Sequence, residues 1–251
     1  MLHLSFSNAR LRDLLLLLLS LATPLSFADT AVVETAQGAT MTYEYEGDSL
    51  RLTPDRDNPQ NYAILRDGTL FSVSETNGEP TVINVSQAMA LLGAAVQQAA
   101  PGAANARVES LTKTGRKETV ANIEGEVYDI TFVDFDGKTQ RAQMVLSKDP
   151  RAVRFRDAVF TFATVVTESM GQEIDQEQLQ SQLIAENLGV LRYGDDLSVA
   201  VIQEDTINPQ RFELPAPPID MSNLGGLQNM LKGSSDGDGI MGKTFDELLG
   251  N

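Results

Sequence analysis

The chain has 251 residues, a net charge of −16, no cysteine and no tryptophan, and its one histidine is His3. His3 lies in the N-terminal segment that we interpret below as a signal peptide, so the mature chain would contain neither histidine nor cysteine. Such a chain excludes disulfides, thiol nucleophiles, Ser-His-Asp catalysis and metal sites built on thiolates or histidines. The negative charge excludes nucleic-acid binding through general electrostatics. The plainest role of this negative charge is to keep the protein soluble. The alternatives are that the charge docks a basic partner or weakly binds a divalent cation.

Residues 1–28 are typical of a secretory signal peptide. Arg10 and Arg12 form a charged start, an apolar run begins at residue 14, and Ser26-Phe27-Ala28 predicts cleavage after Ala28. The apolar run is too short to span a bilayer in the ordinary way. We therefore expect an exported protein with no stable membrane span. The lack of cysteine also excludes a lipidated N-terminus.

Residues 29–85 predict a series of strands joined by turns. Asp67-Gly68 and Asn77-Gly78 each stand between two strand-forming runs, as expected for two-residue hairpins, and Gly47-Asp48 predicts a third turn. Residues 54–59 read as a polar loop with proline at both ends. The expected strands cover residues 31–35, 41–45, 49–53, 62–65, 70–73 and 81–85.

An alanine-rich helix is expected over residues 87–100, with Ser86 as its N-cap. Met89 and Leu92 lie on its apolar side, and Pro101-Gly102 ends it. This helix either caps the sheet as a surface element or forms a mobile lid over a cavity.

Residues 111–146 predict consecutive antiparallel strands, with turns at Gly115, Glu124-Gly125 and Asp136-Gly137. Tyr128, Ile130 and Phe132 share one apolar face, and Met144 belongs to the strand after the last turn. Such a face packs on a solid core or lines an apolar pocket, and the pattern alone leaves both possible.

Asp149-Pro150 predicts the start of a second helix. Its apolar stripe would hold Phe155, Val159, Phe162, Val166 and Met170. A basic cluster at this start is either a solvated face or a docking spot for an anionic headgroup. It consists of Lys148, Arg151, Arg154 and Arg156.

A third helix is expected over residues 174–187, followed by strands over 190–193 and 197–202 and a short edge segment over 211–215. Residues 217–251 predict a flexible tail with short amphipathic helices. Residues 236–239 lack the spaced acidic ligands of a calcium loop. We expect no metal site, no cofactor and no catalytic residue.

The order of several short motifs carries a family resemblance over residues 30–216. These motifs are YEYEGDSLR at 43–51, RDGTLF at 66–71, VINVS at 82–86, TGRKETVA at 114–121 and FELP at 212–215. The chain resembles an uncharacterised family of exported bacterial proteins, a domain of unknown function distantly similar to the outer-membrane lipoprotein carrier (LolA-like) half-barrels. The resemblance implies an α+β fold over residues 29–216, in which a curved antiparallel sheet, an incomplete β-barrel, is covered by α-helices.

In the lipoprotein carrier group the concave face receives acyl chains. The resemblance therefore implies a periplasmic, non-enzymatic binding protein that holds an apolar or lipid ligand, or a lipidated protein partner. The alternative is an envelope accessory or scaffold protein that binds its partners through the acidic surface and the C-terminal tail. A hydrolase using carboxylates is a third possibility, but no paired acid motif stands out. The expected ligand cavity is lined by Tyr128, Ile130, Phe132, Met144, Met89, Leu92 and Phe162.

Overall fold

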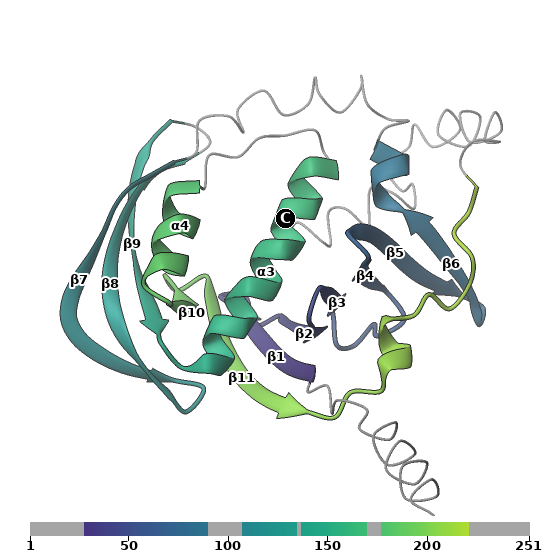
Figure 1. Ribbon diagram of the computed structural model, residues 1–251, viewed down its shortest axis with the longest axis horizontal. Helices are drawn as coiled ribbons and strands as arrows, with labels where there is room; N and C mark the ends of the chain where they lie inside the picture. The colour runs from purple at the N-terminus through teal and green to yellow at the C-terminus, as the bar shows by residue number, and fades with distance from the viewer. Residues whose placement is uncertain (1–27, 90–106, 135–136, 170–176, 221–251) are drawn as a thin grey trace, which may run out of the picture.

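The computed structural model describes residues 28–89, 107–134, 137–169 and 177–220. Within these residues, eleven strands form one antiparallel sheet, in the order β6-β5-β4-β3-β2-β1-β11-β10-β9-β8-β7, which curves around helix α3 (Figure 1). The strands are β1 (Ala28–Thr35), β2 (Thr40–Glu46), β3 (Ser49–Thr53), β4 (Tyr62–Arg66), β5 (Thr69–Thr76), β6 (Glu79–Asn84), β7 (Arg107–Val120), β8 (Ile123–Val133), β9 (Thr139–Ser147), β10 (Gly189–Tyr193) and β11 (Leu197–Asp205).

The first six strands form an antiparallel meander, as the sequence predicts. Asp67-Gly68 and Asn77-Gly78 adopt positive φ angles of 50°, 70°, 56° and 83° and join β4 to β5 and β5 to β6. Gly47 has φ 56° and joins β2 to β3. These angles are the ones that tight hairpin turns require, and glycine and asparagine tolerate them best.

Two of the three turns predicted between residues 111 and 146, those at Gly115 and at Glu124-Gly125, are wrong. Gly115 has φ 78° but lies inside β7, where the pairing with β8 shifts register between Lys113 and Lys117. It therefore forms a bulge that bends a long strand. The actual hairpin turn is Ala121-Asn122, with φ 50° and 60°, because the register pairs Val120 with Ile123.

Gly125 lies within β8, and the fold needs a glycine there for a reason other than a turn. A Cβ added there would stand 2.6 Å from Val145 Cγ1 and 3.0 Å from the backbone oxygen of Leu146. The glycine lets β8 and β9 approach closely at this point. The third expected turn is confirmed: Gly137 has φ 77°, and its N–H donates to the Asp134 carbonyl over 3.0 Å.

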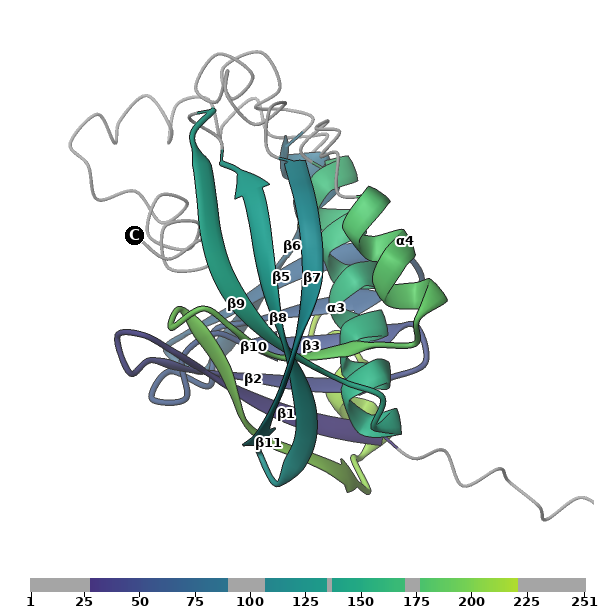
Figure 2. The same cartoon turned by 90° about the vertical axis from the view of Figure 1, so that its left-hand side faces the viewer.

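Helices α3 (Pro150–Ser169) and α4 (Glu177–Ala185) lie on the same side of the sheet (Figure 2). A further helical stretch begins at residue 85 and is described as far as residue 89. Its N-cap is Asn84, whose Oδ1 accepts from the Gln87 N–H over 3.0 Å, and not Ser86. The rest of the expected alanine-rich helix, including Leu92, lies outside the described residues.

The short edge segment expected over 211–215 overlaps the end of a 3-10 helix, η2 (Pro209–Phe212). Asn208 caps it by accepting from the Gln210 N–H, and Pro209 fits its first turn. We call residues 206–219 the C-terminal strap. Its Leu214 and Ala216 pack on a small cluster of β4, β5 and β6, and the Ile219 N–H donates to the Val82 carbonyl over 2.9 Å.

The predicted large antiparallel sheet with accompanying helices is confirmed. The sheet is open, because its order ends at β6 and β7, and the described helices cover only part of it. Residues 1–27 and 221–251, which hold nearly all of the expected signal peptide and most of the expected tail, lie outside the described residues.

Candidate functional site: the concave face around helix α3

Helix α3 begins where the sequence predicts, at Asp149-Pro150. Asp149 Oδ1 accepts from the Arg151 backbone N–H over 2.9 Å, which satisfies one of the free donors of the first turn. The Arg151 guanidinium binds the same carboxylate and holds the pKa of Asp149 below its ordinary value. The helix is thus capped and charge-paired at its start.

The first turn of α3 packs directly on the start of β10. A Cβ added to Gly189 would stand 2.1 Å from the backbone carbon of Ala152 and 2.2 Å from its oxygen. Ala152 itself is fully buried. Only glycine allows the strand to pass this close, so Gly189 fixes the height of α3 above the sheet.

The two halves of α3 differ in burial. The first half holds the buried residues Ala152, Phe155, Arg156 and Ala158. Within residues 159–169 of the helix, no side chain is fully buried, although six of them are apolar and half-buried. These six residues, which we call the α3 apolar flank, are Val159, Phe160, Phe162, Ala163, Val165 and Val166.

One side of α3 joins the main apolar cluster of the molecule. Phe155 contacts two tyrosines of β2, with its ring centroid 5.3 Å from Tyr43 and 5.9 Å from Tyr45. Burial raises the pKa of Tyr43 to about 12. The pKa of Tyr45 is raised as well, chiefly by burial and to a smaller extent by the nearby Asp29 carboxylate. Both phenols therefore stay neutral across the physiological range and act as packing groups.

The other side of α3 meets a second apolar cluster beneath α4. Here Leu183 of α4 and Leu188 are buried against the strands β8 and β9. Phe160 of α3 and Leu179 of α4 pack against this cluster from above. The half-buried rings of Phe132 and Tyr193 lie 6.2 Å apart at its rim.

The residues expected to line one cavity are therefore divided between two places. Tyr128, Ile130 and Met144 are buried in the cluster beneath α4, and Phe132 is half-buried beside them. Phe162 packs against the main cluster on the other side of α3. Met89 is buried, and Leu92 lies outside the described residues. Helix α3 thus separates side chains that sequence reasoning grouped together.

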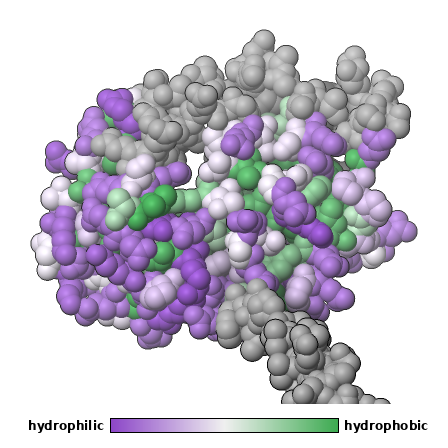
Figure 3. Space-filling model, viewed as in Figure 1, coloured by the Kyte–Doolittle hydropathy of each residue, from purple (hydrophilic) through white to green (hydrophobic). Residues whose placement is uncertain are grey.

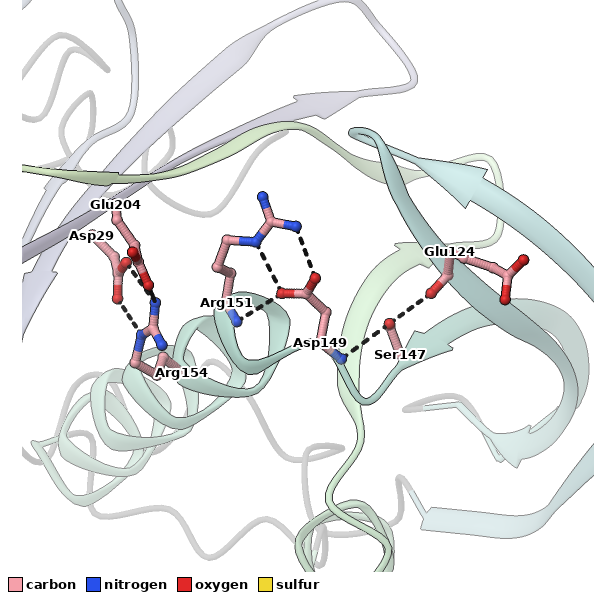
Figure 4. Close-up of polar contacts among 7 residues, drawn as sticks. All are labelled: Asp29, Glu124, Ser147, Asp149, Arg151, Arg154 and Glu204. Atoms are coloured by element: carbon pink, nitrogen blue, oxygen red, sulfur yellow. Dashed lines mark hydrogen bonds and ion pairs between the residues drawn. The ribbon is translucent and has the colours of Figure 1, made fainter.

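The basic cluster at the start of α3 is not a simple solvated face, because its three arginines make internal contacts. Figure 4 shows those of Arg151 and Arg154. Arg154 donates to Asp29 of β1 over 2.6 and 3.0 Å and to Glu204 of β11 over 2.7 Å. The Asp29 carboxylate raises the pKa of Arg154 above its ordinary value. This contact ties the start of α3 to the middle of the sheet.

Arg156 is the buried member of the cluster, with 4% of its side chain exposed. Its Nη1 donates to the carbonyl oxygens of Leu183 and Leu188, each over 2.8 Å. The same end of α4 is closed by Asn187, with φ 55°, and by the Leu188 N–H donating to the Leu183 carbonyl. Arg156 therefore caps α4 from the neighbouring helix.

Two more arginine–carboxylate pairs hold distant elements together. Arg192 of β10 donates to both oxygens of Glu118 of β7 over 2.8 and 2.9 Å, although β8 and β9 separate these strands in the sheet. The pair can form because the β7–β8 hairpin curls back. Arg211 of the C-terminal strap binds Glu44, beside Arg51, whose guanidinium lies 3.4 Å from the Tyr62 ring centroid.

A depression of about 570 Å³ lies on strands β7, β8 and β9, and most of the residues that line it are polar. Within it Gln143 donates to Asp129 over 2.9 Å. Its polar residues alternate with the apolar residues beneath α4, so they belong to the opposite face of the strands. It is lined by Ser110, Thr112, Asp129, Ile130, Thr131, Arg141, Ala142 and Gln143.

Among residues 28–89, 107–134, 137–169 and 177–220, no group of three or more histidine, cysteine or acidic side chains could hold a metal ion. In the same part of the chain, no helix is long and apolar enough to cross a membrane. No family model, curated protein or solved structure matches the chain.

Sequence reasoning missed the paired arginines and the capping role of Arg156. Each of these contacts joins residues far apart in the chain, so no local spacing announces it. The one available signal was the density of arginine at the start of a helix, where cations oppose the helix dipole. Such placement indicates that nearby carboxylates compensate the charge.

Proposed function

We propose that the protein is a periplasmic, non-enzymatic binding protein that holds the acyl chain of a lipid or of a lipidated partner. The proposed binding surface is the concave face along the α3 apolar flank. The observation that carries the proposal is the incomplete burial of this flank. A helix that only completes a core buries its apolar stripe, whereas an apolar surface left half-open marks a place for a ligand.

The surroundings of the flank fit an uncharged ligand. Apolar side chains gather around α3 and toward β5 in an otherwise mostly hydrophilic surface (Figure 3). Arg151, Arg154 and Arg156 bind carboxylates or carbonyls of the protein itself, so their charges are already compensated. The tyrosines that touch Phe155 are held neutral by burial. A hydrocarbon chain would replace water on this surface without desolvating a charge.

The geometry also fits the length of such a ligand. Residues 159–169 span roughly 15 Å at 1.5 Å per residue, which is close to the length of a medium acyl chain. Phe160 and Phe162 point to different apolar clusters. A chain lying along α3 could therefore contact both clusters.

Native mass spectrometry of the protein tests the proposal. The full chain, including its expected signal peptide, would be expressed in a bacterium. The mature protein, residues 29–251, would then be purified from a periplasmic extract without detergent. The expected spectrum contains protein bound to a mass that dissociates as a lipid. A sample that shows only the free protein, and that stays free after incubation with lipid vesicles, would contradict the proposal. That result would turn attention to the acidic surface and a scaffold role.

A further inference from the structure

The bond between Ala28 and Asp29, where signal cleavage is expected, is built into the middle of the sheet. Ala28 is 1% exposed and Asp29 is 3% exposed. On one side Ala28 pairs with Asp205 and Asp29 with Glu204 of β11, and on the other side Asp29 pairs with Tyr45 of β2. Both edges of this piece of chain are therefore occupied by neighbouring strands.

The side chain of Asp29 adds a further restraint. Its two carboxylate oxygens accept from Arg154 of α3 over 2.6 and 3.0 Å, and only 4% of this side chain is exposed (Figure 4). A peptidase binds its substrate as an extended chain with free backbone groups. The bond can therefore enter a peptidase only when β1 is released from β11 and from Arg154.

The topology of the sheet indicates at which stage of folding the Ala28–Asp29 bond becomes protected. The ladder between β1 and β11 is the one that joins β1–β6 to β7–β11 in the described sheet. Strand β2 follows β1 directly, whereas β11 (Leu197–Asp205) lies near the end of the described chain. Pairing over so long a separation forms late, because the intervening loop must close first.

We propose that the Ala28–Asp29 bond is a processing site that is open to a signal peptidase only until β11 pairs with β1. The proposal rests on the export proposed above. Hydrolysis adds one water, leaves a carboxylate on Ala28 and creates an ammonium group on Asp29. The cut removes only the terminal Ala28–Asp205 pair, while Asp29 keeps its contact with Arg154.

The test uses the full-length chain and a purified bacterial signal peptidase in a mild non-ionic detergent. One sample is refolded before the peptidase is added, and the other is diluted from urea directly into it. We expect the refolded chain to be cut at least about 100-fold more slowly, since cleavage follows the population of the open form. Mass spectrometry should show that the product begins at Asp29.

Two variants of β11 sharpen the test. Ile202→Asp places a charge at a core position that is 5% exposed, and Val201→Asp places it next door at a position that is 42% exposed. The first should abolish protection and the second should preserve it. If circular dichroism shows that Ile202→Asp does not fold, Ile202→Ala should give a smaller loss of protection in a folded chain.

The outcomes separate this inference from the proposed export. Equal cleavage of both samples before Asp29 would overturn the protection by the β1–β11 pairing and leave the proposed export untouched. A chain that is not cut in either sample, or a product that begins at another residue, would overturn the processing site, and the first of these results would also count against export.

Discussion

At the scale of single residues, Gly125 and Gly189 are glycines that the fold uses for close packing and not for turns. The sequence predicted a turn at Gly125, but neither glycine has a positive φ angle. In each case the missing Cβ makes room for a neighbouring backbone or side chain. The space, and not the conformational freedom of glycine, is what the fold uses at these positions.

Gly189→Ala should destabilise the protein by at least about 3 kcal/mol, because the new methyl group would overlap the backbone of Ala152 and force α3 away from β10. Urea unfolding followed by circular dichroism measures this change. Gly38→Ala is the control, since it has φ 80° but nothing within 4 Å of the added Cβ. It should cost only about 1–2 kcal/mol, and an equal effect of the two variants would contradict the packing argument.

The Glu118–Arg192 pair predicts part of the response to acid. Hydrogen bonds from Arg192 hold the pKa of Glu118 below its ordinary value of roughly 4.3. The stability that the pair contributes is therefore complete above that ordinary value and is lost as pH falls through the lower pKa of the folded state. Partial exposure of Glu118 screens the pair, so the effect is modest.

Urea unfolding midpoints measured between pH 7 and pH 3 test whether the pair loses its stabilising effect as the pH falls. Glu118→Gln should lower the midpoint at pH 7 and flatten its fall below about pH 4. Glu79→Gln, at an exposed position of β6, should leave the curve unchanged. A Glu118→Gln curve that runs parallel to that of the unmodified protein down to pH 3 would argue against the pair.

At the scale of elements, Arg156 should decide how firmly α4 is seated. Arg156→Met keeps the length of the side chain but removes the guanidinium donor from both carbonyls. The Leu183 carbonyl keeps the Leu188 N–H as a donor, and the Leu188 carbonyl loses its bond to Arg156. We expect a loss of roughly 2–4 kcal/mol and faster amide exchange in residues 177–188 than elsewhere in the chain. Hydrogen exchange with mass spectrometry reads this out.

Arg66→Met is the matched control, because Arg66 pairs with Asp67 in an exposed turn. Such a pair contributes less than about 1 kcal/mol. If Arg156→Met raised exchange uniformly over the whole chain, the arginine would be a general core contact and not a specific cap of α4.

The strands and helices were mostly predictable, because alternation, Asp-Gly and Asn-Gly turns and the Asp149-Pro150 cap are local signals. The errors fall where a local signal is ambiguous. Gly115 bends a strand, Gly125 makes room for a neighbouring strand, and Asn84 caps a helix two residues earlier than expected. The edge segment expected over residues 211–215 missed η2 (Pro209–Phe212), because this helix is short and contacts β3 and β4, which are distant in the sequence.

At the scale of the whole molecule, the candidate site depended on packing that no local pattern contains. The apolar residues Tyr128, Ile130 and Met144 were expected together and lie together beneath α4. Their separation from Phe162 arises because α3 runs between the two clusters. The half-burial of the α3 apolar flank likewise depends on the curvature of the sheet, which the strand pattern does not specify.

The most direct test of acyl-chain binding uses a long-chain fatty acid that carries a dansyl fluorophore. Val166→Asn changes a half-buried valine of the α3 apolar flank, and Val201→Asn makes the same change at an exposed valine of β11. We predict saturable binding to the unmodified protein, binding on the order of tenfold weaker for Val166→Asn, and unchanged binding for Val201→Asn. Folded protein that does not bind the probe, or two variants that bind it equally well, would contradict the proposed site.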